Sequence, residues 1–279
     1  NNSTEINLAK GSGTGDNAGK AGYFKNDGSG NAVWENQVDS TLNGGSDMYV
    51  ATVQGDLDFV KLEAWYAGLQ DTFNTYTLAA TSNLDLAENA KLGLEARYVN
   101  LKLTNDARKG IASSINPLVV GGITADDLES KNDMFRLAVD GKFSIVNARL
   151  AYTKTGKDGG LTALDQDAKN TSLGWAITSN GVANADYIQA ALGADILDNL
   201  NFTLHYGNIK AKDQTNSGKT FPINLTNYKA QEVYGQLTYK MSKNLSTYLR
   251  YGTYEEKQVS TGDKNQDQTR GRIQVAYTF

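Results

Sequence analysis

The sequence predicts an all-β protein, a transmembrane antiparallel β-barrel of which about eleven strands are visible. Three observations predict this class: a strictly alternating last segment, a series of long alternating strands before it, and connections that are short and long in turn. The composition agrees, with 28 Gly, 15 Tyr, only 2 Pro and a hydrophobic fraction of 39%. A barrel with a wet interior needs apolar residues only on its outside, so low average hydropathy is expected.

The last segment, 267–279, reads DQTRGRIQVAYTF. From Arg270 onward, alternate residues are polar or small, and the residues between them are apolar, aromatic or glycine, which is the period of a strand with one polar and one apolar face. A strand of this kind that ends on an aromatic residue is typical of the closing seam of a bacterial transmembrane barrel. We therefore predict Phe279 to be the assembly signal. The alternative, from this segment alone, is an edge strand of a soluble sandwich.

Ten earlier segments show the same alternation. In one of them Leu92, Leu94 and Tyr98 lie on the opposite face from Glu95 and Arg97. The strands are predicted to be about 8 to 14 residues long, whereas globular strands average about 5–6 and transmembrane strands need about 9–11. The alternating cores cover 49–53, 60–66, 73–81, 90–103, 135–140, 146–153, 188–194, 200–206, 233–239 and 245–251. Turns or short links are predicted at 56–58, 83–89, 141–142, 195–199 and 242–243.

The chain, 1–279, is predicted to be one barrel domain. Residues 1–46 have the Gly, Asn, Ser and Asp content of a loop, expected on the extracellular side, and 47–279 carries the strands. Long loops are predicted near 104–131, 154–184, 210–227 and 255–266. Four unpatterned loops of this length are improbable inside a compact soluble domain. Alternation of short and long connections matches the periplasmic turns and extracellular loops of barrels.

The strand count carries a topological consequence. A closing strand that ends at the periplasmic side puts the start of the first strand, near Asp47, at the extracellular side. Bacterial single-chain barrels have even strand numbers, so we expect upstream strands to be missing and the chain to be part of a larger barrel of 16–18 strands. The alternative is that a piece of 1–46, such as 5–9, supplies a twelfth strand and closes a small barrel.

Tyrosines recur late on the apolar faces of the strands. An amphipathic ring suits the headgroup depth of a membrane, although each tyrosine taken singly could be an ordinary core residue. Taken together as one register, they predict an aromatic girdle. Its candidates are Tyr66, Tyr98, Tyr152, Tyr206, Tyr239, Tyr251 and Tyr277.

Six of the seven arginines fall on the polar faces, as expected because an arginine on the lipid face at the membrane midplane costs roughly 2–4 kcal/mol. The predicted pore-lining residues are Arg97, Arg136, Arg149, Arg250, Arg270 and Arg272, with Glu63, Glu95, Asp140 and Glu232 as acidic partners. A basic wall opposite acidic residues would set a transverse field across the pore. Equally, the charges could pair locally and hydrate the lumen. A constriction loop folded into the pore is expected to be missing if upstream strands are missing.

Other functional classes find little support. The chain has no Cys and no apolar run long enough for a transmembrane helix. A net charge of −4 argues against nucleic-acid binding. No cofactor, no metal site and no enzyme activity are predicted. A barrel hydrolase would have to use the lone histidine, His205, yet no G-x-S-x-G nucleophile motif occurs, and His205 is predicted to line the lumen.

Five segments carry a resemblance to a known family: MYVATVQG, VKLEAWYAG, LDNLNFTLHYGN, YGQLTYKMSKNLSTYLRYGTYEEK and TRGRIQVAYTF. Together they resemble the carboxy-terminal part of the Campylobacter-type major outer membrane porins, most specifically in the last two hairpins and their S-K-N turn. The resemblance covers about 47–279, by pattern only through the long loops. It implies an eighteen-stranded, trimeric, general-diffusion porin whose first seven strands are absent from this sequence.

The sequence therefore predicts an outer membrane porin: a water-filled channel for passive diffusion of small hydrophilic solutes and ions. Its expected partners are the lipid bilayer of the bacterial outer membrane, these solutes and two further copies in a homotrimer. The alternative is a surface adhesin or interaction barrel that acts through its long extracellular loops.

Overall fold

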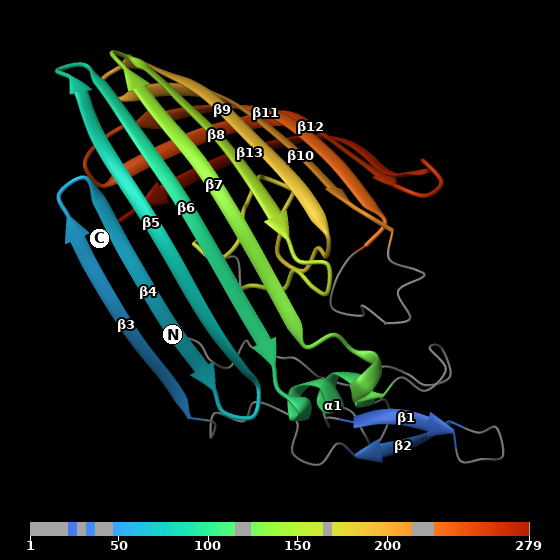
Figure 1. Ribbon diagram of the computed structural model, residues 1–279. Helices are drawn as coiled ribbons and strands as arrows, with labels where there is room; N and C mark the ends of the chain where they lie inside the picture. The colour runs from blue at the N-terminus through green and yellow to red at the C-terminus, as the bar shows by residue number, and fades with distance from the viewer. Residues whose placement is uncertain are drawn as a thin grey trace.

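Residues 22–26, 32–36, 47–114, 124–163, 169–213 and 226–278 are described by the computed structural model. Eleven strands form one sheet in which each strand pairs antiparallel with its neighbours in the chain. They are β3 (Met48–Leu57), β4 (Val60–Leu69), β5 (Phe73–Ala87), β6 (Ala90–Leu103), β7 (Lys131–Phe143), β8 (Val146–Thr155), β9 (Ala185–Leu197), β10 (Leu200–Ala211), β11 (Tyr228–Lys240), β12 (Leu245–Gln258) and β13 (Lys264–Tyr277). Figure 1 shows them side by side as one curved wall. The predicted all-β antiparallel architecture is confirmed.

The two ends of the wall differ. The turns that join β3 to β4, β5 to β6, β7 to β8, β9 to β10 and β11 to β12 lie together at one end, here called the turn end (upper left in Figure 1). The long connections lie at the opposite, loop end. Pairing of Leu245 with Tyr277 brings the end of β13 to the turn end. Pairing of Met48 with Leu69 puts the start of β3 at the loop end, the orientation expected for the region near Asp47.

Several strands extend further than predicted. Residues 141 and 142 were expected to turn, but Gly141 and Lys142 still pair with β8, and the reversal comes at Ser144, which has a φ of 51°. Likewise β5 continues to Ala87, β9 to Leu197 and β12 to Gln258. The boundary predictions were wrong at these places because backbone pairing continues past the point where the apolar alternation stops.

The loop end carries structure that the sequence reading assigned only as loop. Helix α1 (Asn105–Ser114) and the short helix η3 (Ala125–Asp127) lie within the predicted loop 104–131. The hydroxyl of Thr104 accepts a hydrogen bond from the Ala107 N–H at 3.2 Å, which caps α1. Ile111 is 3% exposed and packs with Leu101 and Leu103 of β6. Within the described residues, no helix has the length and hydropathy needed to cross a membrane.

Two short strands, β1 (Gly22–Asn26) and β2 (Ala32–Asn36), form an antiparallel hairpin separate from the large sheet. This hairpin lies in the part of the chain where no strand was predicted. The segment 5–9, weighed as a twelfth strand, lies outside the described residues, as does Phe279.

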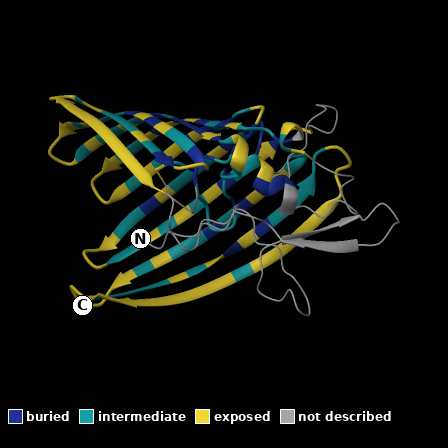
Figure 2. Cartoon of the chain, turned by 90° about the horizontal axis from the view of Figure 1, so that it is seen from below, coloured by how far each residue is buried: buried dark blue, intermediate teal, exposed yellow. Residues whose placement is uncertain are grey.

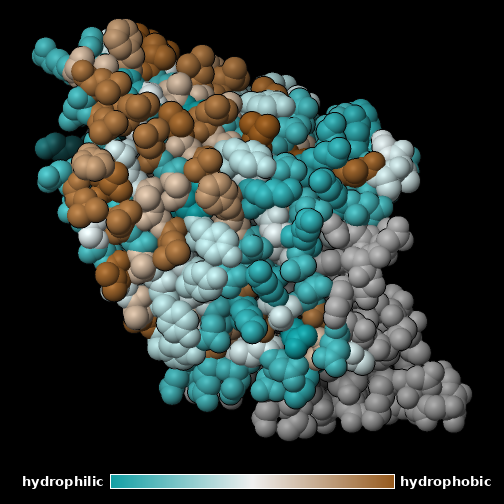
Figure 3. All heavy atoms as spheres, viewed as in Figure 1, coloured by the Kyte–Doolittle hydropathy of each residue, from teal (hydrophilic) through white to brown (hydrophobic). Residues whose placement is uncertain are grey.

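The two faces of the wall have opposite chemistry. Between the turns and about the middle of each strand, large apolar side chains on the convex face are exposed, as at Leu137, Leu192 and Leu204 with exposed fractions of 46%, 58% and 47%. Figure 2 shows exposed and buried residues alternating along the strands. In Figure 3 the hydrophobic side chains gather over the turn-end half of the convex face, and hydrophilic ones cover the loop end. A folded chain exposes a band this large only where another apolar phase covers it.

The polarity of the faces inverts toward the loop end. On β6 the convex face changes from Leu94 to Asn100 and Lys102, while the concave face changes from charged residues to Leu101. On β10 the same change leads from Leu204 to Lys210. We infer that the inversion marks the limit of the apolar band on the side of the loop end.

Candidate functional site

A cluster of charged residues lies at the centre of the concave face. The Glu95 carboxylate of β6 accepts hydrogen bonds from Arg136 Nη2 at 2.7 Å and Arg136 Nε at 2.8 Å, and from Arg97 Nε at 3.1 Å. Arg149 Nη2 lies 3.8 Å from Glu95 Oε2, and Arg149 Nη1 donates to Asp140 Oδ2 at 2.6 Å. Adjacent strands bring these groups together, because Arg97 is paired in register with Arg136, and Asp140 with Arg149. We call these five residues the arginine cluster.

The charges of the arginine cluster pair with immediate neighbours. Arg97 and Arg136 are only 7% and 5% exposed, and buried guanidinium groups require such partners. Three guanidinium groups meet two carboxylates, which leaves one net positive charge. Arg149 is the most open of the three arginines, with 40% of its side chain exposed, and its partner Asp140 is 46% exposed. Of the two interpretations offered by the sequence, this geometry favours local pairing with a residual positive charge over acidic and basic walls that face each other.

The connection between β8 and β9 folds back against the concave face. The described residues of this connection are 156–163 and 169–184. The second stretch, which we call the inward segment, contacts several strands of the wall, and Figure 1 shows it beside the sheet. Arg136 Nη1 donates to the Thr171 carbonyl at 2.8 Å, and the hydroxyls of Thr153 and Ser172 are 2.7 Å apart. Gln189 Nε2 donates to the Leu173 carbonyl at 2.8 Å. A constriction loop was expected to be missing if upstream strands are missing; the inward segment is a loop of the described chain that lies against the concave face.

A second anchor holds the middle of the inward segment. Glu232 of β11, 3% exposed, accepts hydrogen bonds from the backbone N–H groups of Trp175 at 3.0 Å and Ala176 at 2.7 Å. The Trp175 ring lies edge-on to Tyr234, with centroids 5.4 Å apart. The Arg250 guanidinium lies 5.3 Å from the Trp175 centroid and 4.9 Å from that of Tyr234, a cation–π geometry. Glu232, predicted as an acidic partner of the arginines, therefore hydrogen-bonds to the backbone of the inward segment.

The remaining predicted lining residues lie outside the arginine cluster. Arg250 donates to Gln236, and Arg270 donates to Gln268 and lies 4.7 Å from the centroid of the Tyr254 ring. Arg272 is opposite Arg250 in the β12–β13 register. Glu63 accepts a hydrogen bond from Trp65 Nε1 at 3.1 Å.

His205 does not show the arrangement that a barrel hydrolase requires. Its ring is stacked on Tyr234, with centroids 4.5 Å apart and an interplanar angle of 15°. Within the described part of the chain no serine hydroxyl is hydrogen-bonded to His205.

The seven predicted girdle tyrosines do not form one row. Tyr66, Tyr98, Tyr152, Tyr206 and Tyr251 lie on strands that run from the turn end to the loop end, whereas Tyr239 and Tyr277 lie on strands that run the other way. The first five fall about six to eight residues beyond a turn, roughly 20–26 Å along the strand at about 3.3 Å per residue. The other two are beside the turns. The single-register prediction was wrong because antiparallel neighbours reverse direction, and the result is two levels separated by an apolar band.

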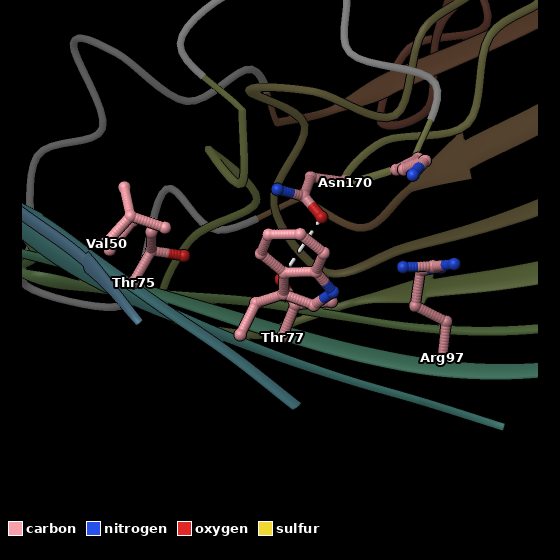
Figure 4. A pocket seen from close by; sticks show the side chains of 8 residues that line it. Val50, Thr75, Thr77, Arg97 and Asn170 are labelled. Atoms are coloured by element: carbon pink, nitrogen blue, oxygen red, sulfur yellow. Dashed lines mark hydrogen bonds between the residues drawn. The ribbon is translucent and has the colours of Figure 1, made fainter. Parts of the chain in front are cut away.

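Two cavities flank the inward segment. One, of about 250 Å³, lies between its residues Lys169 and Asn170 and the wall at Trp65, Thr75 and Arg97. Figure 4 shows Asn170 reaching Thr77, whose hydroxyl donates to the Asn170 side chain at 3.1 Å.

The other cavity, of about 330 Å³, lies between residues 171–174 and the wall at Arg149, Ala191 and His205. The arginine cluster reaches both cavities, since Arg97 lines the first and Arg136 and Arg149 line the second. Consecutive residues of the inward segment therefore border both cavities.

Comparison with solved structures identifies the architecture. The chain aligns with OccAB2 of Acinetobacter baumannii at a TM-score of 0.59 and 18% identity, covering 85% of this chain and 57% of that one. The outer membrane protein OprD of Pseudomonas aeruginosa gives 0.59 and 19%, with 83% and 58% covered. The fold is that of these outer membrane β-barrels. OpdK of Pseudomonas aeruginosa, solved with vanillate, gives 0.56 and 14%, with 83% and 55% covered.

The chain spans less than three fifths of the length of these three barrels. At these identities the likeness concerns the fold. No protein-family model matches the chain, and no curated protein matches it significantly.

Proposed function

We propose that the chain forms part of the wall of an outer membrane channel that passes small hydrophilic solutes and ions by passive diffusion. The observation that carries the proposal is the two-faced wall: an exposed apolar band on the convex side and charged residues with flanking cavities on the concave side. A wall of this kind separates lipid from water. No reaction is proposed, since the concave face offers positioned charges and hydrogen-bonding groups that act on a solute's size and polarity.

Completion of the barrel by further strands is also part of the proposal. Within the described residues β3 and β13 are the two edges of the sheet, and nearly all their residues are exposed (Figure 2). The edge strands β3 and β13 have 10 and 14 residues, and their outer edges leave many backbone N–H and C=O groups unpaired. Unpaired backbone groups are too costly in the hydrocarbon core of a membrane. We propose that further strands complete a barrel of 16–18 strands, as the Campylobacter-type resemblance implies. The homotrimer of that resemblance is proposed with it, and native mass spectrometry of the extracted protein tests both.

Roles for individual residues follow from this proposal. The arginine cluster and Arg250, Arg270 and Arg272 would line the water-filled path, with Glu63 and Glu232 beside it. The two levels of tyrosines would mark the two membrane interfaces. The inward segment would narrow the path at the level of the arginine cluster.

Planar-bilayer recording of the full-length protein tests the function. We expect stepwise, roughly ohmic conductance increases, together with swelling of liposomes in small sugars or amino acids and none in large oligosaccharides. Channel selectivity is expected to lean toward anions because of the net positive arginine cluster. A membrane-inserted, folded protein that produces no conductance steps would contradict the proposal.

A further inference from the structure

We propose that Glu232 is a positioning residue that holds the inward segment against the wall and thereby sets the width of the channel. This inference rests on the proposed function. It concerns one carboxylate whose hydrogen bonds go to the backbone of a segment that lies more than fifty residues away in the chain.

The surroundings of Glu232 are shaped for this contact. Its carboxylate is 3% exposed and accepts the N–H groups of two consecutive residues, Trp175 and Ala176. Gly174 and Gly207 leave the space that it occupies, because a Cβ at residue 174 would overlap the carboxylate and one at 207 would lie 3.1 Å from its Cγ. The site therefore depends on small residues on both the segment and the wall.

The contact differs in kind from the other anchors. Arg136, Thr153 and Gln189 hold residues 171–173 through backbone carbonyls and one hydroxyl. Glu232 instead supplies a charged acceptor for two backbone N–H groups. Hydrogen bonds to charged groups are roughly twice as strong as neutral ones, and Arg136 is the other charged anchor. It also fixes the backbone of Trp175, whose ring lies against Arg250 and Tyr234. Loss of the carboxylate leaves two partly buried N–H groups without their acceptor.

The consequence for the channel follows from the position of the cavities. Residues 169 and 170 line the cavity at Arg97, and the next residues, 171–174, line the cavity at Arg149. Release of the segment from β11 would join the two spaces. A channel with the segment released should therefore conduct more and admit larger solutes.

The first test measures release of the segment without using conductance. Ser172 is 2% exposed, and the chain has no cysteine, so Ser172→Cys in the full-length protein reports opening through its labelling rate with a soluble maleimide. Adding Glu232→Gln is expected to raise that rate by about tenfold or more, since a hydrogen bond to a charged acceptor contributes roughly such a factor to an equilibrium. Glu63→Gln is the matched control, because among the described residues the Glu63 carboxylate accepts a hydrogen bond from Trp65 of its own strand and none from the inward segment.

The second test restores the segment by a covalent bond. The hydroxyls of Thr153 and Ser172 are 2.7 Å apart, so Thr153→Cys with Ser172→Cys is expected to form a disulfide. In the Glu232→Gln background, oxidation should return a raised single-channel conductance to the wild-type step, and reduction should raise it again.

The outcomes separate the two proposals. An unchanged labelling rate in Glu232→Gln, or an equal rise in Glu63→Gln, overturns the role of Glu232. Faster labelling with unchanged conductance overturns its control of channel width. A wild-type protein that inserts and never conducts overturns the proposed function itself. Faster labelling with a larger conductance that the disulfide reverses supports the inference.

Discussion

Replacing Glu95 with alanine is expected to destabilise the folded wall by about 3–5 kcal/mol, the cost typical of removing one partner from a buried ion pair. Glu95 accepts hydrogen bonds from Arg97 and Arg136, which are 7% and 5% exposed. Without it, two buried guanidinium groups lose their carboxylate. Arg149 also loses a nearby negative charge, so the net positive charge of the cluster rises from one to two and anion selectivity should increase.

The change is measured by heat-induced unfolding of the full-length protein in detergent, followed by gel mobility, and by the reversal potential in a salt gradient. Asp85→Ala is the control, because Asp85 and its partner Lys91 have side chains 78% and 66% exposed, and exposed pairs contribute at most about 1 kcal/mol. Glu95→Gln, which keeps the shape, should be intermediate in stability. Equal stability of the Glu95→Ala and Asp85→Ala proteins would contradict a structural role for the cluster.

Replacing Leu204 with arginine is expected to impair membrane insertion by roughly 2–4 kcal/mol. Leu204 lies on the convex face of β10, 47% exposed, between Phe202 and Tyr206 on the same face. An arginine there would meet lipid in the middle of the apolar band. The preceding residue, Thr203, faces the concave side, so Thr203→Arg places the same charge in water.

The folded fraction of each full-length variant in lipid bilayers, measured by protease resistance and gel mobility, compares the two positions. We expect a large loss for Leu204→Arg and a small one for Thr203→Arg. The assignment of the faces would be wrong if both variants folded equally well, or if Thr203→Arg were the worse.

The sheet could be predicted because its signal is local. Alternation such as Phe135, Arg136, Leu137 assigns each side chain to a face without any knowledge of what lies across it. That signal also put Arg97, Arg136, Arg149, Glu95 and Asp140 on one face, and antiparallel neighbours then brought them together. The exact ends of the strands could not be predicted from the sequence, because backbone pairing with β8 continues at Gly141 and Lys142, where the apolar alternation has stopped.

The inward segment could not be predicted for a physical reason. Residues 169–184 have no period, and their contacts with Arg136, Gln189 and Glu232 are set by tertiary packing. Trp175, which joins Arg250 and Tyr234, was therefore missed. A composition signal was present, since Ile177 and Val182 are apolar residues in a polar loop and are buried against the wall.

The two tyrosine levels, by contrast, could have been predicted from the sequence. Strand direction alternates in any antiparallel barrel, so Tyr206, six residues beyond the turn on β10, and Tyr239, beside the turn on β11, must lie at different levels. The residues that follow on the same face also give the level: after Tyr98 come Asn100 and Lys102, and after Tyr152 comes Lys154.

The claim that the concave face borders water and the convex face borders lipid is tested most directly by cysteine modification during single-channel recording. Ala191 lines the cavity beside Arg149, and its neighbour Leu192 lies on the convex face, 58% exposed. In full-length Ala191→Cys, a charged, membrane-impermeant thiosulfonate should reduce the current of open channels in discrete steps. In Leu192→Cys the same reagent should leave the current unchanged. Block through Leu192→Cys but not through Ala191→Cys would contradict the proposed channel wall.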